Sequence, residues 1–259
     1  MGKNTPGDLL GQIERDLLAE KPLDSLLRKL VLLGGSAGSA ELREWASSEL
    51  RGYDNDEELP RYRTITAPLQ IDGAVPGGII RNQSISPMDL PDFARDDVTE
   101  LVRLQMGIRE IRSMIDRHQS DQVVKLLPPG SSSLVGYMNR SARRNGQISD
   151  LYWSVSIVAL DGVLDQVRTR LAELIAEMRA ATPHGQTLPT GAQATNAVNL
   201  VIRGRGNRVT IAQTVETQPK SEGDPVHAPR FWTRARTIGA SVVGLATIVG
   251  TIAAVLPLV

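Results

Sequence analysis

The chain contains no cysteine and only three histidines, and both shortages restrict its chemistry. Without a thiol it forms no disulfide, holds no thiolate metal site and has no cysteine nucleophile. The histidines, His118, His184 and His227, fall at the end of a predicted helix and in two predicted linkers. Histidines in such positions are generally solvated, so we expect neither metal binding nor acid–base catalysis from them.

The sequence also lacks the motifs of common catalytic and nucleotide-binding sites. The stretch Gly34–Gly38 is rich in glycine, but no Gly-Lys-Ser/Thr follows it, so it is expected to join two helices rather than to form a P-loop. The pair Gly204-x-Gly206 lacks the third glycine of a dinucleotide fingerprint, and no G-x-S-x-G occurs. We therefore predict no enzyme activity, no catalytic residue, no cofactor and no metal site.

The net formal charge is zero, but the charges are unevenly distributed. Between Asn196 and Arg236, seven basic residues stand against three acidic ones. A basic segment beside an apolar one fits the anionic inner leaflet of a membrane better than it fits nucleic acid. The N-terminal sequence MGKNTPGDLL lacks the apolar core of a signal peptide, so we expect that the chain is not exported. Its C-terminal tail is then expected to insert into the membrane after synthesis.

The last stretch, Ile238–Val259, contains no charged residue. About 22 residues at about 1.5 Å each give roughly 33 Å, which is enough to cross a hydrocarbon core of about 30 Å. We predict a single transmembrane helix in a bacterial inner membrane, with the N-terminal body in the cytoplasm; a buried C-terminal core helix is the alternative. The expected interface anchors are Arg230, Phe231, Trp232, Arg234 and Arg236. Small residues expected to let such helices pack together are Ala240, Gly244, Ala246, Gly250 and Ala254.

For the part of the chain before this tail, the sequence pattern predicts a mainly α (α+β) fold. It comprises a helical N-terminal domain over residues 1–182 with a small irregular β insertion. The insertion is expected within the Pro- and Gly-rich stretch Pro60–Pro91, and a loop with at most a short strand is expected over Val123–Asn139. Apolar residues at helical spacing predict five helices, over Asp8–Glu20, Pro22–Leu33, Ser39–Leu50, Asp97–Asp116 and Ile148–Ala181.

A short β segment is predicted between two linkers, residues 183–195 and the basic juxtamembrane residues 217–237. Alternating apolar residues around a Gly/Asn turn predict a hairpin within 196–216. An isolated hairpin is barely stable in water, so it either stacks with copies from other chains or folds back onto the body as edge strands; we favour stacking. The residues expected to form this oligomerising segment are Val198, Leu200, Ile202, Gly204, Gly206, Asn207, Val209 and Ile211.

Two clusters of residues, about 90 residues apart, form a recognisable pair of motifs. The first is Trp45-x-x-x-Glu49-Leu50-x-Gly52-Tyr53, followed by Leu59-Pro60-x-Tyr62-Arg63. The second is Tyr152-Trp153, followed by Gly162-Val163-Leu164-Asp165-Gln166-Val167-Arg168-x-Arg170-Leu171. Together they resemble the AbiTii domain of bacterial abortive-infection and other phage-defence proteins. The resemblance covers about residues 5–182 and implies a role in antiphage defence, but it carries no catalytic residues with it. Asp165 and Arg168 are expected to pair on one helix face.

These features predict a membrane-anchored antiphage effector that assembles through its cytosolic part and permeabilises the inner membrane. Its expected partners are membrane lipid, further copies of the chain, and a phage-derived trigger or a second defence protein, but not nucleic acid. Two alternatives stay open. One is a membrane-tethered sensor or scaffold for a separate effector. The other is a nuclease with a metal ion on Asp54, Asp56 and Glu58.

Overall fold

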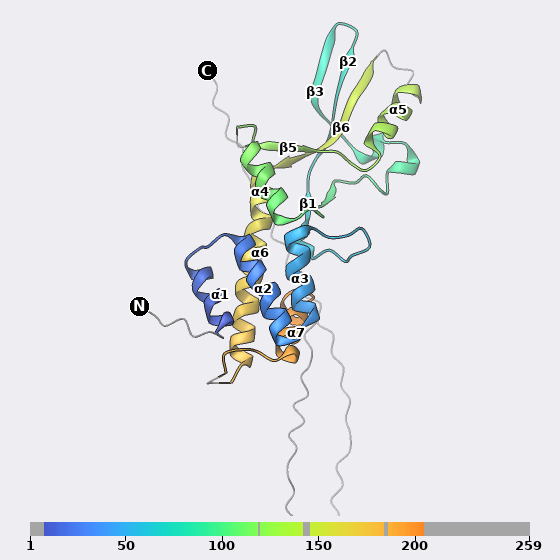
Figure 1. Ribbon diagram of the computed structural model, residues 1–259. Helices are drawn as coiled ribbons and strands as arrows, with labels where there is room; N and C mark the ends of the chain where they lie inside the picture. Colours follow the sequence, from blue (N-terminus) through green and yellow to red (C-terminus); the bar gives the residue numbers. More distant parts are fainter. Residues whose placement is uncertain (1–7, 119, 142–145, 184–185, 205–259) are drawn as a thin grey trace, which may run out of the picture. The chain divides into compact units, whose positions relative to one another are not determined.

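The structure is a computed structural model that describes residues 8–118, 120–141, 146–183 and 186–204. All of them belong to the first of two structural units, Met1–Thr210. They form seven α-helices and six β-strands, which confirms the α+β class (Figure 1). Within these ranges no helix combines the length and the apolar character needed to span a bilayer, and the predicted transmembrane helix Ile238–Val259 lies outside them.

The first three helices form close to the predicted positions: α1 (Leu9–Leu18), α2 (Leu23–Ala37) and α3 (Ala40–Arg51). The Asp8 carboxylate caps α1 by accepting from Gly11 N at 2.9 Å, and the Ser39 hydroxyl caps α3 by accepting from Leu42 N at 3.2 Å. Helix α2 continues through the predicted Gly34–Gly35 end and stops at Gly38, whose φ of 78° terminates it.

The strands form a larger β structure than the sequence predicts. A four-stranded antiparallel sheet has the order β3-β2-β6-β5, and β1 pairs with β4 in a separate two-stranded sheet. Three short 3-10 helices accompany the strands: η1 (Arg61–Arg63) precedes β1, and η2 (Pro87–Asp89) and η3 (Asp92–Ala94) lie between β3 and β4. The strands are β1 (Thr64–Thr66), β2 (Leu69–Val75), β3 (Gly78–Ile85), β4 (Leu101–Arg103), β5 (Val123–Leu126) and β6 (Gln147–Ser156).

Three predictions for the middle of the chain are wrong. The helix predicted over Asp97–Asp116 is only α4 (Ile108–Arg117), because residues 101–103 pair with β1 as strand β4. The stretch Val123–Asn139, predicted to be a loop with at most a short strand, holds the short strand β5 but also the unpredicted helix α5 (Ser131–Ser141). The helix predicted from Ile148 begins nine residues later as α6 (Ile157–Ala181), since residues 147–156 form β6 at the centre of the sheet.

Helix α6 carries the longest apolar stripe of the described chain. It follows β6 directly, and the Ser156 hydroxyl caps it by accepting from Val158 N at 3.2 Å. Its helical pattern starts at Leu160, and every residue predicted for the stripe is buried. The helix packs against α1, α4 and α7 (Figure 1). The stripe is Leu160, Val163, Leu164, Val167, Leu171, Leu174, Ile175 and Met178.

The prediction of the first hairpin strand is also wrong, because residues 191–201 form helix α7 (Gly191–Val201). A capping box between Thr190 and Gln193 starts this helix, within the predicted linker 183–195. Val198 is buried and Leu200 is 46% exposed, so the alternation that predicted a strand does not describe the burial. Ile202 is the C-cap and Gly204 follows with a φ of 61°. Gly206, Asn207, Val209 and Ile211 lie outside the described residues.

Candidate functional site

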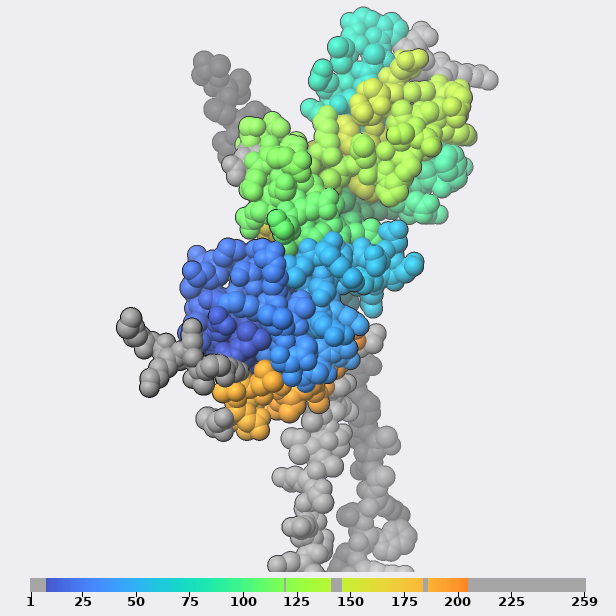
Figure 2. Space-filling model, in the orientation of Figure 1, coloured from blue at the N-terminus to red at the C-terminus, as the bar shows by residue number. Residues whose placement is uncertain are grey.

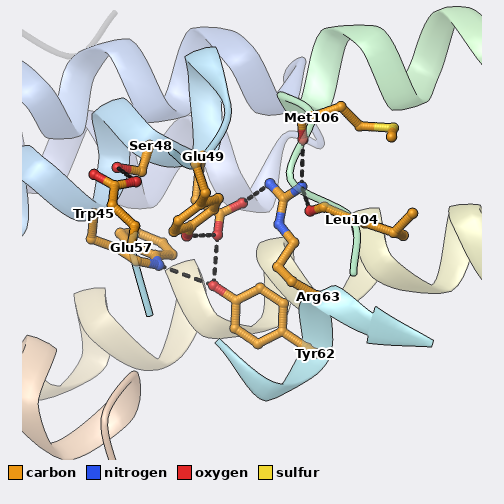
Figure 3. A network of polar contacts seen from close by, with 9 residues as sticks. Trp45, Ser48, Glu49, Glu57, Tyr62, Arg63, Leu104 and Met106 are labelled. Carbon is orange, nitrogen blue, oxygen red and sulfur yellow. Dashed lines mark hydrogen bonds and ion pairs between the residues drawn. The ribbon is translucent and has the colours of Figure 1, made fainter. Parts of the chain in front are cut away.

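The first residue cluster of the sequence forms a buried polar network around Glu49 (Figure 3). Helix α3 places Trp45 and Glu49 one turn apart on the same face, and η1 brings Tyr62 and Arg63 against them. Glu49 Oε1 accepts from the Tyr53 hydroxyl at 2.5 Å and from the Tyr62 hydroxyl at 2.7 Å. Trp45 Nε1 donates to the Tyr62 oxygen at 3.0 Å. Local helix geometry and a short returning loop thus bring all five side chains together.

Arg63 forms an ion pair with Glu49 Oε2, and both side chains are completely buried. Arg63 Nη1 also donates to the carbonyl of Met106 at 2.8 Å (Figure 3). The backbone carbonyl of Arg63 accepts from Leu104 N at 2.8 Å. The pair therefore ties α3 and η1 to the connection between β4 and α4. Removal of one member of such a pair leaves an uncompensated buried charge, which costs about 3–5 kcal/mol.

The two tyrosines of the network act as hydrogen-bond donors. Burial, reinforced by the Glu49 carboxylate, raises the pKa of Tyr53 and of Tyr62 well above the ordinary value of a phenol. Both hydroxyls stay protonated near neutral pH and are poorly suited to act as bases or nucleophiles there. The arrangement therefore supports a structural role for this cluster.

A second polar cluster lies on one face of the four-stranded sheet. The Asp72 carboxylate accepts from Lys125 Nζ at 2.6 Å, from the Tyr152 hydroxyl at 2.9 Å and from the Asn82 backbone N–H at 2.8 Å. Lys125 Nζ also lies 4.2 Å from the centre of the Tyr152 ring. The hydrogen bond from Lys125 is the main reason that the pKa of Asp72 falls to about 2. These contacts join β2, β3, β5 and β6 where the ladders of β2 shift register.

Another part of the sheet borders an open pocket of about 1090 Å³, which it shares with α5 and the segment η2–η3. The amide of Asn139 fixes α5 beside β6, because it both donates to the carbonyl of Ile148 and accepts from its N–H at 2.8 Å. Phe93 and Tyr137 meet edge to face with their ring centres 5.1 Å apart, although they are 64% and 43% exposed. Figure 2 shows α5 and the β2–β3 hairpin as neighbours on the surface.

This pocket is about as large as the larger small-molecule sites, and its lining mixes apolar and polar side chains. Its sheet wall includes Ile71, Ile80 and Ile85, and Leu90 and Met138 come from the other walls. Sequence reasoning missed the pocket, because α5 falls in a stretch rich in Pro, Gly and Ser that was predicted to be a loop. The aromatic residues Phe93 and Tyr137 belong to no helical or strand periodicity in the sequence that would have indicated the pocket.

The loop that carries Asp54, Asp56, Glu57 and Glu58 is hydrogen-bonded to itself and to α3. Glu57 Oε2 accepts from Asp54 N at 3.1 Å and from the Ser48 hydroxyl at 3.5 Å, which ties the loop to α3. Over the described ranges, no group of three or more His, Asp or Glu side chains is placed to hold a metal ion. The predicted pairing of Asp165 with Arg168 is wrong, since Arg168 Nη2 donates to the carbonyl of Lys21 at 3.2 Å.

The residues predicted to contact the membrane lie outside the described residues. This applies to the interface anchors Arg230–Arg236 and to the small-residue face Ala240–Ala254. Their proposed roles therefore stay predictions from the sequence.

The described residues thus define an α+β domain with a buried Glu–Arg pair and an open pocket of mixed polarity beside its sheet. A family model described as AbiTii matches residues 8–202, and the chain belongs to the AbiTii family. The match includes α7 and both residue clusters, and the family points to a role in abortive infection and phage defence. Comparison with curated proteins and with solved structures gives no match.

Proposed function

We propose that this AbiTii protein is a membrane-anchored effector of abortive infection that permeabilises the bacterial inner membrane. The observation that carries the proposal is the uncharged stretch Ile238–Val259, preceded by Arg230, Phe231, Trp232, Arg234 and Arg236. Length and apolar character suit a membrane span, and basic and aromatic residues at one end suit its cytoplasmic interface. The domain over residues 8–202 then receives the signal of infection in the cytoplasm, without enzyme activity of its own.

A single tail only anchors the chain, whereas the tails of several assembled copies together permeabilise the membrane. The strand predicted at Val198–Ile202 does not support this step, because those residues belong to α7 and its cap. The small-residue face of the tail, from Ala240 to Ala254, remains the basis for contact between copies. Weak contacts between tails become effective once the cytosolic parts hold them close together.

The test is leakage of a small dye from infected cells that carry either the full chain or a chain ending at Arg236. We expect leakage and protection only with the full chain. A third strain carries an unrelated membrane span in place of Ile238–Val259, which keeps the anchor and removes the small-residue face. Protection by the chain ending at Arg236 would contradict the proposal, and protection by the replacement span without leakage would reduce the tail to an anchor.

A second candidate, a membrane-tethered sensor for a separate effector, is favoured by the 1090 Å³ pocket with its exposed Phe93–Tyr137 pair. Exposed aromatic groups beside an open pocket suit binding of a trigger molecule. For a pure sensor, the replacement span preserves protection, whereas Tyr137→Ala removes it. For the effector, the replacement span removes protection.

A further inference from the structure

A second pocket, of about 410 Å³, lies between α2, α4 and α6 and is lined by three arginines. Arg109 and Arg112 come from α4, and Arg168 comes from α6. Its apolar lining is Pro22, Leu23, Ile108 and Leu164, and Asp24, Ser113 and Asp116 complete it. The pocket lies within the size range of small-molecule sites.

Arg168, which lines this pocket, has one unsatisfied donor. Its Nη2 is held by the carbonyl of Lys21, whereas its Nη1 is shielded from solvent and has no hydrogen-bond acceptor among the described residues. A buried charged donor without an acceptor is costly, and in native proteins such a donor is generally satisfied by an ordered water, an ion or a ligand. A guanidinium with one unsatisfied nitrogen favours an oxyanion, which reaches Nη1 after a small movement of the arginine side chain.

Helix α4 adds further donors along one side of the pocket. Arg112 and Ser113 follow Arg109 by three and four residues, so both lie beside Arg109 on the same side of the helix. Arg112 reaches Asp161 only at 3.9 Å, with both side chains more than half exposed. Arg109 forms no ion pair within the described part of the chain. These guanidinium groups are therefore not committed to strong partners.

Two helices begin at this pocket without a side-chain cap. The N-cap residues are Pro22 for α2 and Gly107 for α4, whereas α1, α3, α6 and α7 begin with a capping Asp, Ser or Thr. The first free N–H groups belong to residues 23–24 and 108–109, all of which line the pocket. Unpaired N–H groups and the helix dipole attract an anion to such a terminus.

The carboxylates in the lining do not cancel this positive charge. Asp24 is already paired with Arg28 at 2.9 Å. Asp116 is then the remaining acid against Arg109, Arg112 and Arg168. We infer that this pocket binds the phosphate monoester of a small ligand, with Arg168 and Arg109 on the phosphate and the apolar lining against the organic part. This inference does not depend on the proposed membrane function.

A soluble phosphorylated molecule and a lipid headgroup present the same group, so the experiment separates them. The full chain in neutral detergent is titrated by calorimetry with inorganic phosphate and with AMP. In parallel it is placed in nanodiscs of phosphatidylcholine with and without phosphatidic acid, and thermal unfolding is recorded. The variants are Arg168→Gln, Arg109→Gln and Asp116→Asn. Arg170→Gln is the matched control, because Arg170 lies on α6, pairs with Glu173 and does not line the pocket.

We expect saturable binding that weakens about tenfold or more in R168Q and R109Q, stays unchanged in R170Q and tightens in D116N. Binding of AMP or phosphate identifies a soluble ligand, and stabilisation only by phosphatidic acid with the same pattern identifies a headgroup. If R168Q fails to fold, R109Q is the decisive variant, because Arg109 is exposed and its replacement does not disturb the core. Absence of binding in both formats, equal weakening in R170Q, or weaker binding in D116N would overturn the inference.

Discussion

The buried pair of Glu49 and Arg63 gives the strongest stability prediction. Both side chains are fully buried, and each has a charge that only the other balances. Glu49→Gln leaves the guanidinium without a counter-charge, and Arg63→Met leaves the carboxylate with only two phenol donors. Each single substitution should lower the free energy of unfolding by about 3–5 kcal/mol.

The double substitution separates the pair from its surroundings. When both charges are removed, no buried charge remains uncompensated, so the combined loss should be well below the sum of the two single losses. Urea unfolding of the full chain in detergent, followed by circular dichroism, measures all three. The control is Arg170→Gln, since Arg170 and Glu173 are partly exposed and such a pair contributes at most about 1 kcal/mol. Single losses near 1 kcal/mol, or additive losses, would refute the reasoning.

Three further predictions concern the sheet, α7 and the apolar pocket. Because the pKa of Asp72 is about 2 in the folded chain against an ordinary 3.8, its contribution to stability is complete above about pH 4 and is lost as the pH falls toward 2. Asp72→Asn should flatten this acid limb in pH-dependent unfolding. Val198→Asp should destabilise the fold by about 3 kcal/mol or more and Leu200→Asp by less than about 1 kcal/mol, since only the first is buried, whereas a strand would place both on one face. Phe93→Ala and Tyr137→Ala should each change the melting temperature little and yet reduce protection against phage in a plaque assay.

The parts of the fold that the sequence predicts well are those whose burial follows one period. The stripe from Leu160 to Met178 keeps helical spacing and faces the core along its whole length. In β6 the signal is ambiguous, because Leu151, Tyr152 and Trp153 are consecutive and all buried. A strand at the centre of a sheet, covered on both faces, has no alternation to reveal it.

Helix α7 shows how packing between distant segments overrides a local pattern. Apolar and polar residues alternate from Val198 onward, which is typical of a strand. The helix forms because Ala194, Ala197 and Val198 pack at helical spacing against the rest of the domain and a capping box begins it at Thr190. The small alanines allow this close approach, and a hydropathy pattern does not register them.

Of the candidate sites, only the residues of the Glu49 network were singled out from the sequence, and their geometry was not predicted. Glu49 and Arg63 both belong to the residue cluster that resembles AbiTii, yet their pairing depends on how the 53–63 segment returns to α3. The arginine pocket needs α2, α4 and α6 together. Arg168 was expected to pair with Asp165 along α6, and only the position of Lys21 redirects it.

The Glu49 network and the arginine pocket both reach the start of α4, and this leads to a final prediction. Arg63 binds the carbonyl of Met106, and Tyr53 N donates to the carbonyl of Gln105 at 2.7 Å, so the network fixes the backbone just before Gly107. A Cβ on Gly107 would lie 2.4 Å from the carbonyl oxygen of Leu50. Gly107→Ala should therefore shift the start of α4 and weaken phosphate binding, although Gly107 carries no charge.

The matched control for this substitution is Gly162→Ala on α6, where an added Cβ meets no atom within 4 Å. That change should leave phosphate affinity unaltered and raise stability by about 0.5–1 kcal/mol, as expected for alanine in a helix interior. Both variants are titrated with inorganic phosphate by calorimetry and unfolded with urea. Together the two measurements distinguish a displaced start of α4 from a general loss of stability. If Gly107→Ala binds phosphate as tightly as the unmodified chain while it unfolds more easily, the network supports the fold alone. Weaker binding would instead show that the AbiTii residues buried around Glu49 also position the arginines of α4.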